Sequence, residues 1–264
     1  MKIRTFETAM TKLTFLGTGT SQGVPVISCR CRVCTSDDPR DKRLRASAMV
    51  ETGGVRIIID AGPDFRQQML THRVDRVDAI LLTHEHKDHI GGIDDVRAFN
   101  YTSGRPVDIY ATERVQQTVR KDFDYAFGAF RYPGVPDINL ITIDPCKPFI
   151  IKEVEVVPVS GLHYMLPVLG FRIGNVGYLT DLNSIEESEI EKLKGVDVLV
   201  INALRREHHI SHFTLDEALH VAWLTGAGRT YLTHISHQIG RHAQMCGELP
   251  QWAQFACDGE VVEA

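Results

Sequence analysis

The pattern of apolar positions along the chain predicts two successive groups of β-strands with helices between them. In the first half, strand-like runs cover residues 13–16, 46–51, 55–60, 79–83 and 107–110. In the second half, such runs cover residues 138–143, 149–158, 168–173, 176–180, 196–201 and 229–233. Helical patterns cover residues 63–71, 93–100, 112–122, 185–193 and 215–224. Two sheet-rich halves with helices outside predict an α/β fold, an αββα sandwich.

No low-complexity linker separates the two halves, so we expect one compact domain over residues 1–264. A chain of this length with 43% hydrophobic residues can bury a substantial core. The net charge of −5 gives no general attraction to nucleic acid. We therefore expect no extended nucleic-acid footprint, and any phosphate binding must be local.

The N-terminal residues contain no apolar stretch long enough for a signal peptide, and the chain has no run of 18 apolar residues. These features predict a cytoplasmic protein with no membrane contact. The sequence leaves open whether translation starts at Met1 or Met10, and whether the protein forms a homodimer.

The densest cluster of ligand-type side chains follows the apolar run 79–82. It is Thr83-His84-Glu85-His86-Lys87-Asp88-His89-Ile90-Gly91-Gly92. If the glycine pair opens the next helix, residues 84–89 form a connecting turn. His84 and His86 can then face one metal ion, while Asp88 and His89 can face a second. Two ions about 3.5–4 Å apart would form a two-metal hydrolytic centre.

A second candidate metal site is the cysteine cluster Cys29, Cys31 and Cys34, a knuckle loop near residues 29–34. In a cytosolic protein this spacing is more typical of a metal than of disulfides. Structural zinc takes four ligands, so the fourth must come from elsewhere in the chain. His237 is the best candidate. Three reduced cysteines without a metal are the alternative.

The spacing His84-x-His86-x-Asp88-His89 resembles the signature of the metallo-β-lactamase superfamily. Members of that family supply three more ligands from later loops, and the resemblance places the metals at one edge between the two sheets. The matching residues all follow strand-like runs: His163, Asp181 and His234. The resemblance implies one ion held by His84, His86 and His163, a second held by Asp88, His89 and His234, and Asp181 bridging them.

Within the superfamily, the chain is similar to PhnP-like cyclic phosphodiesterases of phosphonate degradation. The similarity lies in Gly17-Thr18-Gly19, the cysteine knuckle and Leu232-Thr233-His234-Ile235-Ser236-His237. It implies that His212 is a non-ligand histidine that serves the leaving oxygen, and we count Asp88 with it as catalytic. It also implies that Asp60 is buried behind the histidine motif and holds it in shape.

The function implied by the resemblance is that of a dinuclear metal-dependent hydrolase. A metal-bridging hydroxide would open a small cyclic phosphodiester, either phosphoribosyl 1,2-cyclic phosphate or a 2′,3′-cyclic nucleotide. The expected cofactors are two divalent ions, Mn or Zn with Fe as a third option, and one structural Zn.

Three other functions compete with this one. A tRNA 3′-end endonuclease would share the metal ligands, but the chain has no long basic insertion to grip tRNA. A thioester or lactone hydrolase of the same fold would lack the acid at His212. A non-catalytic metal- or nucleotide-binding module would have little reason to keep all seven ligands.

Three further segments are each compatible with two roles. The aromatic-rich residues 123–132 could stack on a substrate base, or could pack in the core or at a subunit contact. Arg205 and Arg206 could contact a second phosphate, although a solvated pair is the plainer interpretation. We expect the glycine-rich residues 17–25 to form a tight turn lining the active site rather than a phosphate-binding loop.

Overall fold

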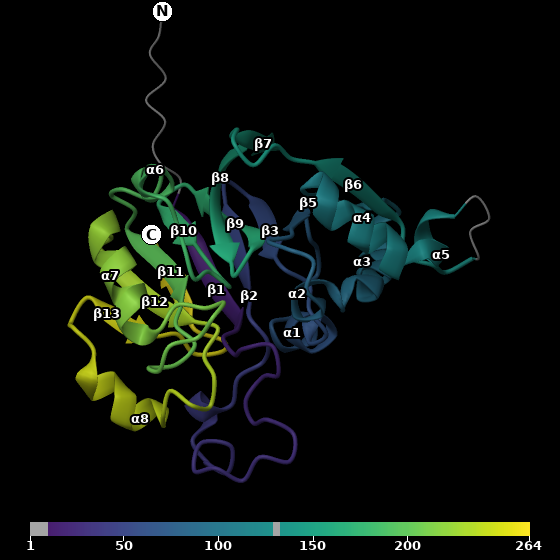
Figure 1. Cartoon of the computed structure of the whole chain (residues 1–264). Coiled ribbons are helices and arrows are strands. Elements are labelled where there is room, and N and C mark those ends of the chain that lie inside the picture. Colours follow the sequence, from purple (N-terminus) through teal and green to yellow (C-terminus); the bar gives the residue numbers. More distant parts are fainter. Residues whose placement is uncertain (1–9, 129–132) are drawn as a thin grey trace, which may run out of the picture.

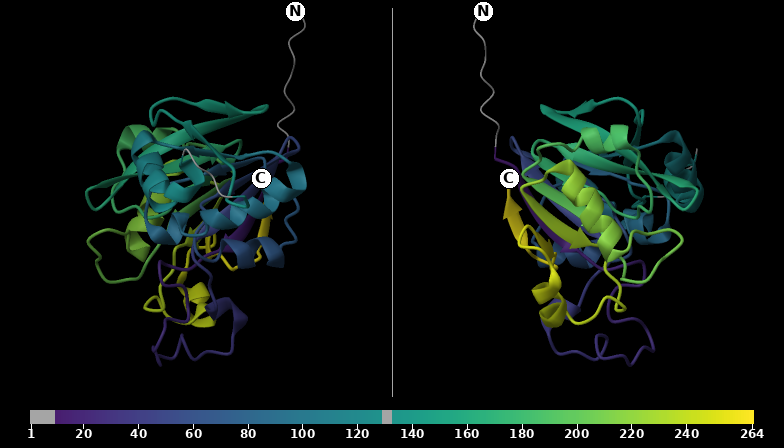
Figure 2. Two further views of the ribbon diagram at one scale, coloured as in Figure 1. Left: turned by 90° about the vertical axis from the view of Figure 1, so that its right-hand side faces the viewer. Right: turned by 60° about the vertical axis from the view of Figure 1, so that its left-hand side comes forward.

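The computed structural model describes residues 10–128 and 133–264. Two seven-stranded sheets stack face to face, and helices cover both outer faces (Figure 1). The predicted αββα sandwich is therefore confirmed. Figure 2 shows the teal helices of the first half on one outer face and the green helix α7 on the other.

The first sheet has the strand order β14-β1-β2-β3-β4-β5-β6. Its strands are β1 (Lys12–Gly17), β2 (Ser47–Thr52), β3 (Val55–Ile59), β4 (Ala79–Leu81), β5 (Val107–Ala111), β6 (Ile138–Thr142) and β14 (Val261–Glu263). The predicted hairpin joins β2 and β3 through Gly53 and Gly54, whose φ angles are 56° and 75°. Glycine suits this turn because both central residues need a positive φ.

The second sheet has the order β13-β12-β11-β10-β9-β8-β7. Its strands are β7 (Phe149–Ile151), β8 (Val154–His163), β9 (Leu166–Ile173), β10 (Val176–Tyr178), β11 (Val198–Asn202), β12 (Arg229–Thr233) and β13 (Ala253–Phe255). Each sheet combines antiparallel strands with a parallel group, β3 to β6 in the first sheet and β10 to β13 in the second. The short edge strands β13 and β14 were not predicted.

The helices lie between the strands along the chain. They are α1 (Phe65–Thr71), α2 (Lys87–Ile90), α3 (Arg97–Ser103), α4 (Glu113–Asp122), α5 (Asp124–Phe127), α6 (Glu187–Glu191), α7 (Leu215–Thr225) and α8 (His242–Met245), with 3-10 turns at Pro39–Asp41, Ile93–Val96 and Cys246–Glu248. The helix expected over residues 93–100 is thus a 3-10 turn followed by α3. None of the helices in the described ranges has the length and apolar character needed to cross a bilayer.

Apolar side chains form three buried clusters that match the layers. The central cluster lies between the sheets and includes the fully buried rings of Phe15 and Phe171. A second packs α1, α3 and α4 against the first sheet, with Phe65 at its centre. A third packs α6 and α7 against the second sheet, through residues such as Leu215. Burial on both faces explains why the central strands are continuous apolar runs rather than alternating ones.

Candidate metal centre

Most of the candidate ligands follow parallel strands, whereas His163 is the last residue of the antiparallel strand β8. Asp60 follows β3 and the histidine motif follows β4, its parallel neighbour. In the second sheet, Asp181 comes after β10 and His234 directly after β12. Asp60, Asp181 and His234 have φ angles of 64°, 58° and 54°. A left-handed conformation is unfavourable for residues other than glycine and is concentrated at functional sites.

The connecting turn expected over residues 84–89 extends only to His86, because helix α2 (Lys87–Ile90) contains Asp88 and His89. Helix α2 begins at Lys87, and Gly91 caps its end instead of opening the next helix. This helical turn packs tightly on the segment after β3. A Cβ on Gly62 would lie 1.9 Å from the carbonyl oxygen of Asp88, and one on Gly92 would lie 2.1 Å from the carbonyl oxygen of Gly62. Glycine permits this close approach.

The first ligand group consists of His84, His86 and His163. Their nearest ring nitrogens lie within 4.8 Å of one another, so they could hold a metal ion. His84 Nδ1 lies 3.0 Å from Thr83 Oγ1, and its buried Nε2 has no hydrogen-bond partner. His163 Nδ1 donates to the carbonyl oxygen of Ser211 at 2.6 Å. Burial lowers the pKa of His163 to about 4 and that of His84 well below its usual value. Neutral imidazoles fixed in this way suit metal binding.

The second group consists of Asp88, His89, Asp181 and His234, again with ligand atoms within 4.8 Å of one another. His89 Nε2 lies 3.2 Å from both Asp88 Oδ2 and Asp181 Oδ2. His234 Nε2 lies 3.1 Å from Asp181 Oδ1. Neither Nε2 atom has a hydrogen-bond partner. Buried imidazole nitrogens and carboxylate oxygens converge here, and these nitrogens make no hydrogen bonds. This arrangement fits a cation bound between them.

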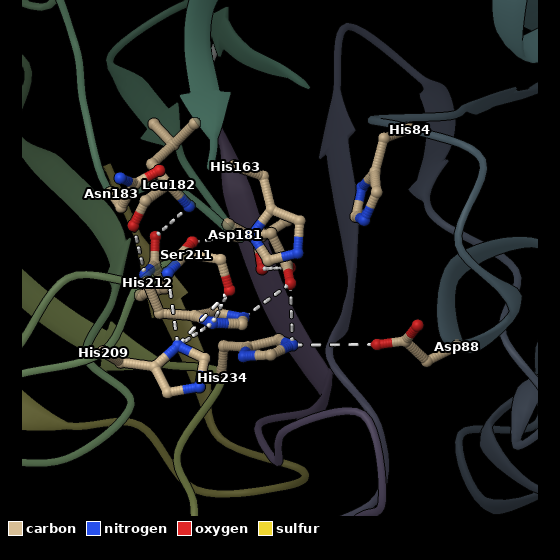
Figure 3. A network of polar contacts seen from close by, with 12 residues as sticks. His84, Asp88, His163, Asp181, Leu182, Asn183, His209, Ser211, His212 and His234 are labelled. Carbon is tan, nitrogen blue, oxygen red and sulfur yellow. Dashed lines mark hydrogen bonds and ion pairs between the residues drawn. The ribbon is translucent and has the colours of Figure 1, made fainter. Parts of the chain in front are cut away.

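His212 lies inside the same cluster, beside both ligand groups (Figure 3). Its Nε2 is 3.1 Å from Asp181 Oδ1, and its ring stacks on His234 with 4.9 Å between the centroids. Ser211 Oγ and His209 Nδ1 lie 3.0 Å and 3.1 Å from its Nδ1. With His163 and Asp181, His212 forms a third group that could hold an ion. Burial lowers the pKa of His212.

Asp60 lies behind the histidine motif, fully buried. One carboxylate oxygen accepts the backbone N–H of Thr83 at 2.9 Å, and the other lies 2.6 Å from His89 Nδ1. Burial opposes protonation of His89, but the carboxylates of Asp181, Asp60 and Asp88 outweigh it and raise the pKa of that ring. Asp60 therefore positions His89 from the side opposite Asp88 and Asp181.

The cysteine knuckle and His237 also come together. The Sγ atoms of Cys29, Cys31 and Cys34 lie 3.3, 3.3 and 3.4 Å from His237 Nδ1. Burial opposes ionisation of Cys31, yet hydrogen bonds from Cys34 N–H and His237 lower the pKa of that thiol to about 6. Burial raises the pKa of Cys34 to about 11. Three sulfurs around one imidazole nitrogen form a donor set that fits a tetrahedral zinc.

Asp60 was expected behind the histidine motif, but two other groups that position the catalytic ligands were not predicted from the sequence. Asn202, buried at the end of β11, accepts the N–H of Leu182 at 2.8 Å and donates to its carbonyl oxygen at 2.9 Å. It thereby fixes the residue that follows Asp181. Asn202 directly follows the apolar run 196–201, and a polar residue at that place in the sequence could have indicated its role. The backbone carbonyl of Ser211, which orients His163, left no signal in the sequence.

The glycine-rich turn packs against the protein's own backbone. The Gly19 N–H donates to the carbonyl oxygen of Leu44 at 2.7 Å, and the Thr20 N–H donates to that of Ile235 at 3.0 Å. These amides are therefore engaged and do not form a phosphate-binding loop. The turn therefore joins Leu44 to Ile235, the residue that follows His234.

The other two uncertain segments have structural contacts. Arg205 donates to Gln238 Oε1 and to the carbonyl oxygen of His208, both at 2.9 Å, and Arg206 pairs with Glu248. In the aromatic stretch, Phe123 is buried in the cluster beneath the first sheet. Ala129, Phe130, Arg131 and Tyr132 lie outside the described residues.

A cavity of about 500 Å³ opens beside the first ligand group. Its lining is His86, His163, Tyr164, Met165, Leu166, Ile210 and Ser211. The cavity thus connects two of the histidines with side chains from the β8–β9 turn and from the segment before His212.

Comparison with known proteins agrees with this architecture. Residues 55–235 match the profile of the beta-lactamase superfamily domain. A solved structure described as a new diphosphatase from the PhnP family superposes with a TM-score of 0.90 at 38% identity, covering 97% of each chain. Zinc-bound PqqB from Methylobacterium extorquens superposes with a TM-score of 0.77 at 18% identity, covering 95% of this chain and 99% of PqqB. At that identity, the PqqB match supports the fold alone.

A relative from Porphyromonas gingivalis is named octanoyltransferase. It is 42% identical over 246 residues, which cover 92% of this chain and 50% of that protein. The chain therefore spans half the length of this curated relative, whose name describes a protein twice as long as the matched region.

Proposed function

The chain belongs to the metallo-β-lactamase superfamily, and from this premise we propose that it is a metal-dependent phosphodiesterase. The observation that carries the proposal is the position of His212, whose Nε2 lies 3.1 Å from Asp181 Oδ1 between the two ligand groups. A general acid beside the ligands suits an alkoxide leaving group, which needs a proton as the P–O bond breaks. The 38% identity to a PhnP-family diphosphatase supports phosphorus chemistry.

In this proposal the seven convergent side chains hold two divalent ions. One ion would be held by His84, His86 and His163 and the other by Asp88, His89 and His234, with Asp181 as a ligand that both could share. Divalent ions bound there supply Lewis acidity toward phosphoryl oxygens and lower the pKa of a bound water to about 7. Mn, Zn and Fe all accept this donor set. The knuckle holds one structural zinc.

The chain's own residues orient the reaction. His212 would donate a proton from Nε2, while Ser211 Oγ and His209 Nδ1 contact the ring on its Nδ1 side. Asp60 holds the ring of His89 at Nδ1, so that its Nε2 faces Asp88 and Asp181. The substrate in this proposal is a small cyclic phosphodiester, either phosphoribosyl 1,2-cyclic phosphate or a 2′,3′-cyclic nucleotide.

A second candidate activity is hydrolysis of an acyl thioester. The relative named octanoyltransferase and the apolar side chains of the adjacent cavity favour it. Thiolate is a good leaving group and needs no proton, so this reaction gives no role to His212.

Turnover by metal-loaded protein separates the two activities. The substrates are bis-p-nitrophenyl phosphate, 2′,3′-cyclic AMP, ribose 1,2-cyclic phosphate and octanoyl coenzyme A. We expect turnover of the phosphodiesters and a loss of roughly 10²–10⁴-fold in kcat for His212→Ala with unchanged metal content. Turnover of the thioester alone, unaffected by His212→Ala, would contradict the proposal.

A further inference from the structure

Large apolar side chains are exposed at the rim of the cavity beside the metal centre. Tyr164, Met165 and Ile210 are 54%, 75% and 59% exposed, and all three line the cavity. They come from two segments distant in sequence, the β8–β9 turn and the segment before His212. Clustered apolar exposure of this kind is a mark of a binding site.

The backbone of Tyr164 is strained in a way that supports a role for its ring. Tyr164 is the first residue of the two-residue turn between β8 and β9, and its φ is 59°. Glycine is the residue usually found at such positions. The turn is held in place because the Tyr164 N–H donates to Asn183 Oδ1 at 2.6 Å. A bulky residue in a left-handed conformation suggests that the side chain is needed for function.

Within residues 10–128 and 133–264, the lining of the cavity offers no lysine or arginine to a second phosphate group. Three basic side chains of the described residues are engaged elsewhere: Arg205 with the carbonyl oxygen of His208, Arg114 with Glu85 and Pro167, and Lys87 with Asp122. A sugar carrying a second phosphate would therefore meet an apolar surface here.

We infer that this cavity binds the nucleobase of the substrate, which makes the substrate a nucleotide rather than a bisphosphorylated sugar. The inference rests on the proposed phosphodiesterase function and selects its substrate class. The ring of Tyr164 provides a stacking surface, and the Met165 thioether favours contact with an aromatic face. Ile210 supplies apolar surface from the other segment. The cavity adjoins His86 and His163, so a base bound there leaves its phosphodiester at the metal centre.

Tyr164→Gly tests the inference without disturbing the turn, because glycine adopts a positive φ without strain. The substrates are 2′,3′-cyclic AMP and glycerol 1,2-cyclic phosphate, which share the reacting ring but differ in the base. We expect kcat/KM for 2′,3′-cyclic AMP to fall roughly 10- to 100-fold, since base stacking on an aromatic residue has that value. We expect the value for glycerol 1,2-cyclic phosphate to stay within about twofold.

Two control variants accompany this measurement. Tyr164→Phe keeps the aromatic face and should retain turnover of 2′,3′-cyclic AMP. Tyr101→Gly removes another highly exposed tyrosine, one that does not line the cavity, and should change neither substrate. Equal losses for both substrates in Tyr164→Gly, or no loss for either, would overturn the inference.

Calorimetric binding of adenosine 2′-monophosphate and ribose 5-phosphate separates this inference from the proposed function. Wild-type protein should bind the adenosine compound more tightly, and Tyr164→Gly should abolish the difference. Suppose that the protein hydrolyses no phosphodiester and still binds adenosine 2′-monophosphate more tightly than ribose 5-phosphate in a Tyr164-dependent way. That result would contradict the proposed phosphodiesterase function and support the nucleobase site. Equal binding of the two compounds, or Tyr164-dependent turnover of octanoyl coenzyme A alone, overturns the base site.

Discussion

His89 Nδ1 lies 2.6 Å from Asp60 Oδ2, and neither side chain is exposed to solvent. The same Asp60 oxygen accepts the hydroxyl of Thr83 at 2.9 Å. The contact fixes the ring so that its other nitrogen, Nε2, faces Asp88 and Asp181. A carboxylate behind a histidine in this way orients the ring and raises its basicity toward a metal.

Replacing Asp60 should therefore weaken metal binding without removing a ligand. We expect Asp60→Asn to lower the affinity of the catalytic site for zinc or manganese by about 10–100-fold. Competition with a chelator of known affinity measures the change. Asp64→Asn is the matched control, because Asp64 pairs with Arg45 and lies outside the candidate ligand groups. Unchanged metal affinity in Asp60→Asn would contradict this role.

The knuckle should contribute a separate, structural metal. We expect Cys34→Ser to remove one zinc per chain and to lower Tm by several degrees, since each 1 kcal/mol corresponds to roughly 2–4 °C in a domain of this size. Metal analysis and thermal unfolding provide the two readouts. Cys146→Ser changes an exposed cysteine outside the knuckle and should change neither. An unaltered zinc content in Cys34→Ser would show that the cysteines bind no metal.

The buried His163 should make the metal-free protein less stable in acid. Its folded-state pKa of about 4 lies below the ordinary value of 6.5, so between these values the unfolded chain binds the extra proton. The free energy of unfolding should therefore fall as pH decreases from 6.5 toward 4. Denaturant unfolding in the presence of a chelator measures this slope. His163→Gln should make the slope smaller, and an identical slope in both proteins would exclude this contribution.

Much of the fold could be predicted from the sequence because its signals are local. The apolar run before His84 and the spacing of the motif predicted a buried strand followed by ligands. The edge strands β13 and β14 were not predicted, because neither lies in a continuous apolar run and each is defined by its pairing with β12 or β1. The roles of Asn202 and of the Ser211 carbonyl were not predicted, because their hydrogen-bond partners, Leu182 and His163, lie far away along the chain.

Substitutions in β4, the strand that precedes the histidine motif, should lower the stability of the fold strongly. Ile80 in β4 is fully buried, so Ile80→Ala should cost about 2–5 kcal/mol in the free energy of unfolding. Leu70→Ala removes a side chain that is 58% exposed and should cost at most about 0.5 kcal/mol. Urea unfolding measures both values. Equal effects of the two substitutions would contradict the layer arrangement described above.

The most direct test of the account is a metal titration of the chelator-treated protein, with 2′,3′-cyclic AMP as substrate and metal content measured at each step. The account predicts that turnover requires two divalent ions per chain in addition to the knuckle zinc. It also predicts that Asp181→Asn abolishes turnover while the knuckle zinc remains bound. Full turnover by protein that carries only the knuckle zinc, or no phosphodiester turnover with all sites filled, would contradict a two-metal phosphodiesterase.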